Sequence, residues 1–147
     1  MQVSNKGRYA LQLMLDLASR KPDQYVSVRS VAQRQQLPEK YLEQIIRTLC
    51  KAGYVKSARG ASGGYRLSQP PENYTVGMIL SLTEGSLSSG WDFSGNGGAL
   101  TELWKALDRA IEHLLDQITL ADLAARDRGQ GAPLEIPNMP FRKEFFP

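Results

Sequence analysis

The chemically informative residues form one run, PEKYLEQIIRTLCKAGYVKSARGASGGYRL, at positions 38–67. Its first part predicts an amphipathic helix over 38–52, because apolar side chains recur there at helical spacing. The apolar face consists of Tyr41, Leu42, Ile45, Ile46 and Leu49. The opposite face offers charged and amide groups that are free to meet a ligand: Lys40, Glu43, Gln44, Arg47 and Lys51.

The second part of the run predicts a basic β-hairpin over 54–67, after Gly53 has ended the helix. Its turn holds Gly60, Gly63 and Gly64, and glycine accepts the positive φ angles that bring a backbone close to a partner. Arg59 adds a fixed positive charge with a planar fork of donors. A hairpin tip of this kind suits a phosphate-lined groove.

The charge of the 147-residue chain is unevenly distributed. Residues 1–70 hold 12 Lys and Arg against 4 Asp and Glu, whereas residues 71–147 hold 6 against 11. A basic half favours a polyanionic partner such as nucleic acid, although charge alone is equally consistent with a solvated basic surface. The coincidence of this half with the basic hairpin favours nucleic acid.

Other classes of protein are disfavoured by what the sequence lacks. Cys50 is the single cysteine, which excludes an internal disulfide and fits a reducing, cytoplasmic compartment. No apolar run reaches the roughly 18 to 20 residues of a membrane span. With one histidine, a Ser-His-Asp catalytic set is implausible. The run GASGG at 60–64 lacks the Lys and the following Ser or Thr of a phosphate-binding loop. We therefore expect that the protein is not an enzyme.

Three helices are predicted to position these side chains. Ser4 can cap a first helix that ends near Arg20 and carries Lys6 and Arg8 in its first turn. Ser27 can cap a short second helix, and Pro38 supplies a preset φ at the first turn of the third. Two short helices joined by a tight turn predict a helix-turn-helix.

The C-terminal half predicts a self-association element. After a helix capped by Thr75 and a Gly/Ser-rich loop, residues 99–117 carry an apolar stripe that needs a large partner surface, most simply the same helix of a second subunit. Its members are Leu100, Leu103, Trp104, Leu107, Ile111, Leu114 and Leu115. We expect a mainly α fold with a small β-hairpin wing. The units are a winged helix-turn-helix (1–84), a flexible loop (85–98), dimerisation helices (99–127) and an extended Pro-rich tail (128–147).

Three motifs together resemble the Rrf2 family of bacterial winged-helix transcription regulators: the opening SNKGRY at 4–9, YLEQ at 41–44, and R-G-x-x-G-G-Y at 59–65. The resemblance covers about residues 1–125. It implies a homodimeric, sequence-specific repressor on a palindromic operator of double-stranded DNA, with helix 38–52 in the major groove and wing 54–67 in the minor groove. The expected DNA-binding residues are Ser4, Lys6, Arg8, Arg29, Pro38, Glu39, Lys40, Tyr41, Glu43, Gln44, Arg47, Arg59, Gly60, Ser62, Gly63 and Gly64.

The side-chain chemistry agrees with these implied roles. Gln44 can pair bidentately with adenine, and the carboxylate of Glu43 can accept from cytosine N4. Arg59 would gain from the negative potential of a narrow A·T minor groove.

One departure from the family pattern bears on the cofactor. The iron-sulfur members resemble one another in three cysteines before the long helix, whereas segment 85–98 has none. We therefore expect no cofactor and no metal. The chain resembles the cysteine-free, CymR-like branch, which implies an effector protein or a small metabolite as a further partner.

Several residues allow two interpretations. Cys50 could be a redox switch or a small core residue, and His113 a metal ligand or a surface residue. Trp91, Asp92 and Phe93 could line an effector pocket or anchor their own loop. For the whole chain, the alternatives are a redox- or metal-sensing regulator and a winged helix that binds protein or RNA.

Overall fold

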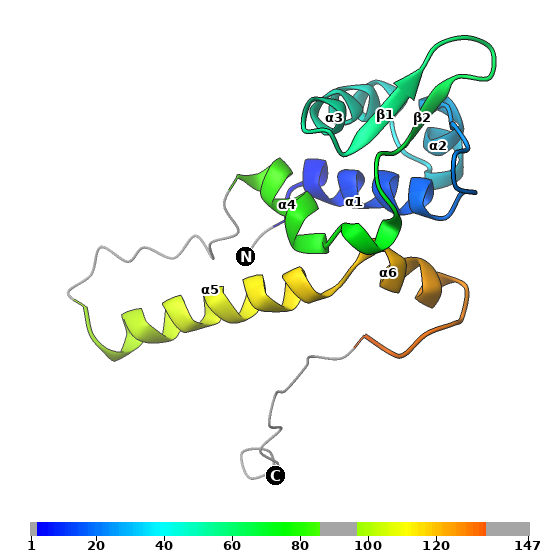
Figure 1. Ribbon diagram of the computed structural model, residues 1–147. Helices are drawn as coiled ribbons and strands as arrows, with labels where there is room; N and C mark the ends of the chain where they lie inside the picture. The colour runs from blue at the N-terminus through cyan, green and yellow to red at the C-terminus, as the bar shows by residue number, and fades with distance from the viewer. Residues whose placement is uncertain (1–2, 86–96, 135–147) are drawn as a thin grey trace.

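The computed structural model describes residues 3–85 and 97–134, and its secondary structure is mostly helical (Figure 1). In chain order the elements are α1 (Asn5–Ala18), α2 (Val28–Gln35), α3 (Glu39–Lys51), β1 (Val55–Ala58), β2 (Gly64–Leu67), the 3-10 helix η1 (Pro71–Asn73), α4 (Val76–Glu84), α5 (Ala99–Gln117) and α6 (Leu120–Asp127). The two strands form one antiparallel hairpin, in which Val55 pairs with Leu67 and Ala58 with Gly64. The predicted fold class, mainly α with a β-hairpin wing, is confirmed.

The helix starts follow from side-chain caps. The hydroxyls of Ser4, Ser27, Thr75 and Thr119 each accept a backbone N–H from the first turn of the helix that follows. Ser4, Ser27 and Thr75 are caps that the sequence predicts, since a hydroxyl satisfies an N–H that has no partner within the helix. Pro38 differs slightly from expectation: it is the residue before the first turn of α3, with an extended ψ of 120°, and not part of that turn.

The hydrophobic core forms around α1, which contacts α2, α3, α4, α6 and the wing. Its fully buried side chains come from both halves of the chain: Leu13, Met14, Val31, Leu42, Ile45, Leu49, Tyr74, Ile79 and Leu120. A second small cluster, Val76 and Leu80 of α4, is partly covered by Leu115 of α5 and Leu123 of α6.

Helix α6 is attached to this core. Leu120 is fully buried and its N–H donates to the Tyr74 carbonyl at 2.9 Å, while the Val76 N–H donates to Ile118 at 2.8 Å. The helix therefore packs on α1 and η1, although it follows the long helix in sequence. The limits of the predicted units stay predictions.

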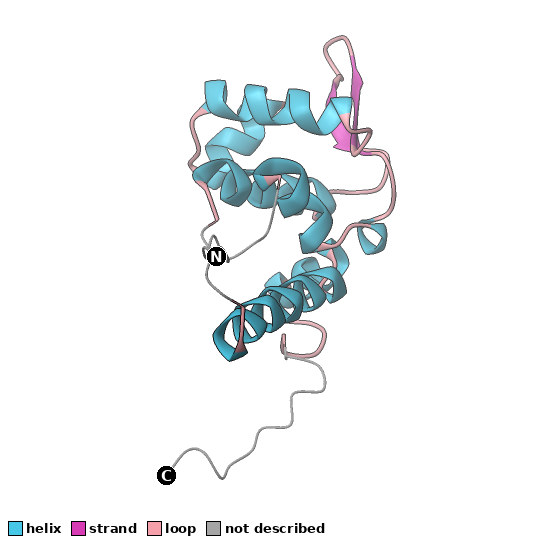
Figure 2. Cartoon of the chain, turned by 90° about the vertical axis from the view of Figure 1, so that its left-hand side faces the viewer, coloured by secondary structure: helices cyan, strands magenta, loops and turns pink. Residues whose placement is uncertain are grey.

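Helix α5 lies at the opposite end of the molecule from α3 and the wing, and the perpendicular view shows the same separation (Figure 2). Its C-terminal end contacts α4, but none of its 19 residues is buried. In the described part of the chain, no helix combines the length and apolarity needed to cross a membrane. Trp91, Asp92, Phe93, most of loop 85–98 and most of tail 128–147 lie outside the described residues.

Candidate nucleic-acid interface

The turn between α2 and α3 is short and sharply defined. Gln36 takes a left-handed conformation with φ of 55°, and the Leu37 N–H donates to the Ala32 carbonyl at 3.0 Å, which closes the end of α2. Pro38 then starts α3 in a new direction. This geometry is a helix-turn-helix, in which the second helix is available to enter a groove.

Helix α3 has one covered and one free face. Leu42, Ile45, Ile46 and Leu49 are buried against α1 and α2. Tyr41 is half-buried and meets the ring of Tyr9 edge-on, with the ring centroids 5.5 Å apart. The free face exposes most of the predicted readers: Glu39, Lys40, Glu43, Gln44 and Arg47.

The wing projects from the same end of the molecule as α3 (Figure 1). Arg59, Gly60, Ala61 and Ser62 at its tip are all exposed. Gly60 has φ of 104°, a conformation that residues with a β-carbon rarely adopt. The tip is thus a turn with an accessible backbone and a single guanidinium.

Close contacts inside the fold leave no room for a β-carbon at Gly63 or Gly64. A β-carbon on Gly63 would lie 2.3 Å from the Ala58 carbonyl oxygen, and one on Gly64 would lie 2.5 Å from that of Val26. The second approach exists because Val26 and Tyr65 exchange two backbone hydrogen bonds of 2.9 and 2.8 Å. Gly63 thus allows the tight turn within the wing, and Gly64 allows the wing to lie against the chain before α2.

Tyr74 fixes the other side of the wing base. Its hydroxyl donates to the Tyr54 carbonyl at 2.8 Å and accepts the Gln69 N–H at 3.0 Å. Burial raises the pKa of Tyr74, so the phenol stays protonated and can donate. Sequence reasoning missed this residue, since a lone tyrosine in a polar turn has no distinguishing pattern.

The N-terminus of α1 is less open than the sequence suggests. The Ser4 hydroxyl donates to Glu84 Oε1 at 2.6 Å and accepts the Gly7 N–H at 3.2 Å. Glu84 approaches so closely that a β-carbon on Gly7 would lie 2.2 Å from its carboxylate oxygen. Ser4 is therefore already engaged within the fold, whereas Arg8 is exposed and Lys6 half-exposed.

A buried carboxylate joins α1 to α2. Asp16 is 3% exposed, and it accepts from Arg34 Nη2 at 2.8 Å, Arg34 Nε at 3.1 Å and Gln35 Nε2 at 3.0 Å. Burial by itself raises the pKa of Asp16, but the hydrogen bonds from Arg34 and Gln35 and the charges of Arg34 and Arg20 outweigh it, so the pKa lies below its ordinary value. Sequence reasoning missed this role of Asp16. The spacing between Asp16 and Arg34, on different helices, gave no signal.

The exposed residues among the predicted DNA-binding set lie in three places: on α3 and the wing tip, on α2, and at the start of α1. The exposed face of α3 and the wing tip lie at the same end of the molecule (Figure 1). Arg29 is exposed on the neighbouring helix α2, and Lys6 and Arg8 lie at the start of α1. Each contact of these residues with DNA stays a prediction.

In the part of the chain that the structure describes, the candidate metal ligands do not form a cluster. Among the described residues, no three His, Cys, Asp or Glu side chains gather around one point. Cys50 is half-buried and burial raises the pKa of its thiol, which disfavours the thiolate that binds metals. His113 is exposed on α5, with one ring nitrogen 2.6 Å from the Gln117 side-chain nitrogen.

Comparison with known proteins identifies the family. Residues 3–126 match the family model Rrf2, described as an iron-dependent transcriptional regulator. The chain belongs to the Rrf2 family. It is 41% identical over 130 residues to the HTH-type transcriptional regulator CymR of Bacillus subtilis, a match that covers 88% of this chain and 94% of that protein. It is also 38% identical over 129 residues to IscR of Aliivibrio salmonicida, covering 84% and 77% of the two chains.

The fold agrees with this assignment to the Rrf2 family. The solved structure of CymR, the global cysteine regulator of B. subtilis, superimposes with a TM-score of 0.81 at 40% identity and covers 86% of this chain and 98% of that one. The protein is therefore a CymR-like Rrf2 regulator that binds DNA and controls transcription, and a module for protein or RNA contact is not favoured.

An iron-sulfur cluster held by three cysteines of one chain does not fit this sequence. A cluster held by three cysteines needs three thiolates, and the whole sequence has one cysteine, Cys50, on α3. The side chains present do not supply that ligand set.

Proposed function

We propose that the protein is a homodimeric repressor that occupies a palindromic operator, with α3 in the major groove and the wing in the minor groove. The observation that carries this proposal is the pairing of two exposed surfaces at one end of the fold: the polar face of α3 and the Arg59 tip of the wing. A helix of this diameter fits the major groove, and an arginine fits a narrow minor groove.

Base reading is assigned to the free face of α3. Gln44 reads adenine through its amide, Glu43 accepts from cytosine N4, and Glu39, Lys40 and Tyr41 lie on the first turns beside them. Glu43 also repels phosphate, so a shifted register is penalised.

Cations on other elements supply the contacts that do not depend on sequence. Lys6, Arg8, Arg29 and Arg47 are each at least partly exposed, and phosphate neutralisation by such groups releases counterions. The wing backbone at Gly60 and Ser62 is accessible for the same purpose.

Dimerisation is assigned to α5. Leu100, Leu103 and Leu107 are 67, 52 and 41% exposed, which is unusual for three leucines on one helical stripe. Pairing of two such helices would cover the stripe and would place two recognition helices about one DNA turn apart, near 34 Å, or a multiple of it.

The two groove assignments can be tested separately by methylation interference. Dimethyl sulfate modifies guanine N7, in the major groove, and adenine N3, in the minor groove. On an operator obtained by selection, we expect interference at guanine N7 inside each half-site and at adenine N3 in the flanking A·T positions. Arg59→Ala should remove only the adenine effect. Absence of any adenine N3 interference with the unmodified chain would refute the wing assignment.

A further inference from the structure

A pocket of about 590 Å³ lies between the C-terminal end of α1, the base of β2, η1 and α6. Its apolar lining includes Leu17, Ala18, Leu67, Pro71, Ala121 and Ala124. Four cationic side chains also line it, Arg20, Lys21, Arg66 and Arg128. The volume falls within the range of roughly 300 to 1,000 Å³ that is typical of small-molecule sites.

The charges around this pocket are not balanced. Arg66 pairs with Asp23, and Arg20 lies 3.9 Å from the Asp16 carboxylate. Within the described ranges, neither Lys21 nor Arg128 forms an ion pair, and Glu72 is the one other acid in the lining. The pocket therefore combines an apolar surface with an excess of positive charge.

We infer that this pocket binds a small organic acid, with the carboxylate at the cationic side chains and an apolar body against Leu17, Leu67 and Ala121. An apolar cavity with a few polar groups that fix orientation is the usual design of such sites. Lys21 and Arg128 supply the charge that selects an anion over a neutral or cationic molecule of the same shape.

The position of the pocket connects it to DNA binding. Arg66 and Leu67 belong to β2 of the wing, whereas Ala121 and Ala124 belong to α6, which directly follows α5. A ligand that contacts both walls can change the position of the wing relative to the dimerisation helix. This regulatory part rests on the proposed function, whereas binding of the acid does not.

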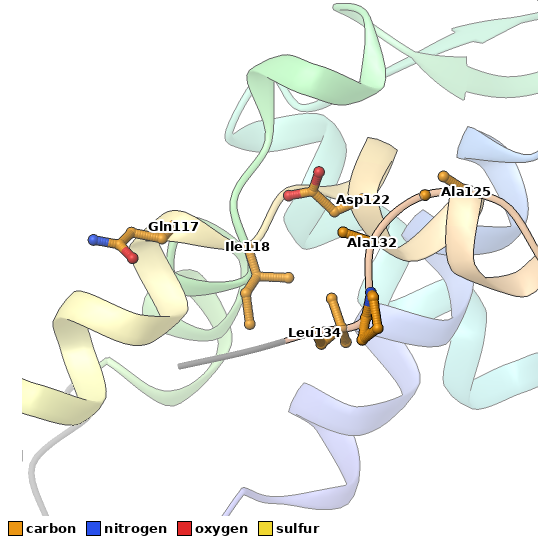
Figure 3. Close-up of a pocket in the computed structure, with 8 residues that line it drawn as sticks. Gln117, Ile118, Asp122, Ala125, Ala132 and Leu134 are labelled. Atoms are coloured by element: carbon orange, nitrogen blue, oxygen red, sulfur yellow. The ribbon is translucent and has the colours of Figure 1, made fainter. Parts of the chain in front are cut away.

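A smaller pocket of about 240 Å³ at the junction of α5 and α6 does not carry the same inference (Figure 3). Its acidic residue, Asp122, already accepts the Thr119 N–H at 2.9 Å in the cap of α6. One of its walls is the segment 131–134, which ends where the described residues end.

The binding claim can be tested with three six-carbon probes of matched shape: hexanoate, hexanamide and hexylamine. Titration of each into the ¹⁵N-labelled full-length chain, followed by amide chemical shifts, should show hexanoate binding with shifts at residues 17–24, 66–72 and 121–128. Hexanamide should bind about tenfold more weakly and hexylamine not measurably. Equal responses to all three probes, or no response in these segments, would overturn the inference.

Variants separate this pocket from the rest of the surface. The double change Lys21→Ala and Arg128→Ala should weaken hexanoate binding by about tenfold, whereas Arg126→Ala, in the last turn of α6 but outside the lining, should leave it unchanged. Ala121→Phe should block binding by filling the apolar part. Undiminished binding by the double variant, measured with its fold verified by circular dichroism, would contradict the assignment of the carboxylate site.

The regulatory claim has its own readout. Saturating hexanoate should change the dissociation constant of the chain for its operator by at least about threefold, and the double variant should not respond. Hexanoate that binds the pocket without changing operator affinity would overturn the coupling only. Failure of the ligand-free chain to bind any duplex would instead overturn the proposed function and leave the pocket result intact.

Discussion

Helices α3 and α5 are both amphipathic, yet the fold treats them in opposite ways. Four apolar residues of α3 are buried, and its polar face is left free. In α5 no residue is buried, and three leucines of its apolar stripe, Leu100, Leu103 and Leu107, are exposed. The difference lies in what each helix packs against. Helices α1 and α2 cover α3, whereas among the described elements α5 has its main contact with α4, near the C-terminal end of α5.

This contrast shows what an amphipathic pattern does and does not determine. The pattern establishes that a helix has a face to bury, but the surface that covers this face can come from the same chain or from another one. For α3 the same chain covers the apolar face, so the polar face is the one left to bind a ligand. For α5 we propose that a second subunit covers the apolar face.

The largest effect is expected from a charge placed in the stripe of α5. Leu107→Glu should convert the dimer to monomers by light scattering, because a buried carboxylate at the seam is costly. Operator affinity should fall on the order of 100-fold, since the two half-sites are then no longer bound by one linked molecule.

Ala106→Glu is the matched control for this change, because Ala106 is exposed and lies beside the stripe on the same helix. It adds the same charge and should leave the dimer intact. If the Leu107→Glu chain remained dimeric, the dimer interface would lie outside the apolar stripe of α5. The proposed difference between α3 and α5 would then fail.

The next largest effect should arise where α2 is held beside α3. Arg34→Ala leaves the buried Asp16 carboxylate without its bidentate partner and should lower the free energy of unfolding by about 2 kcal/mol. Arg29→Ala on the same helix removes an exposed arginine and should leave stability unchanged while weakening DNA binding. Chemical denaturation measures the stability of both variants, and DNA titration measures their affinity. Equal losses of stability in the two variants would refute the assigned role of Arg34.

The same ion pair makes stability depend on pH in a defined direction. The pKa of Asp16 is depressed in the fold, so its contribution is present above the ordinary aspartate pKa of about 3.9 and is lost as pH falls through the lower folded pKa. The stability difference between the wild-type chain and Arg34→Ala should therefore shrink below about pH 4. A difference that stays constant down to pH 2 would exclude Asp16 as its source.

On the free surface next to α3, Arg59→Ala should weaken operator binding by about 1 to 3 kcal/mol and relax the preference at the outer A·T positions. Lys56→Ala removes an equal charge from β1 of the same wing and should have a smaller effect with unchanged base preference. Fluorescence anisotropy with operators that vary at these positions distinguishes the two. Identical behaviour of both variants would reduce Arg59 to a general phosphate contact.

The smallest change in affinity is expected from Gln44→Ala, about 1 kcal/mol, because a single base contact is lost. The salt dependence of binding should stay the same, since no charge is removed. Selection of preferred sequences by the variant should show relaxed choice at one position in each half-site. A changed salt slope with unchanged base preference would argue against base reading by α3.

Local patterns in the sequence predicted much of this fold. Hydroxyl residues placed before runs of apolar residues at helical spacing predicted the starts of α1, α2 and α4, and the glycine-rich turn predicted the wing. These signals are local, because a cap or a turn satisfies backbone groups within a few residues.

Contacts between distant segments were not predictable in this way. Asp16 with Arg34, Ser4 with Glu84, and Tyr74 with Tyr54 each join groups on different elements, so their pairing depends on the assembled fold. The burial of Leu120 is a similar case: its apolar character was evident, but its place beside α1 was not.

The most direct test of the proposed dimeric reader is selection of bound duplexes from a random-sequence pool by the purified full-length chain. The account predicts an inverted repeat whose half-sites lie about one DNA turn apart, or a multiple of it, flanked by A·T pairs. Recovery of no palindromic consensus would contradict it.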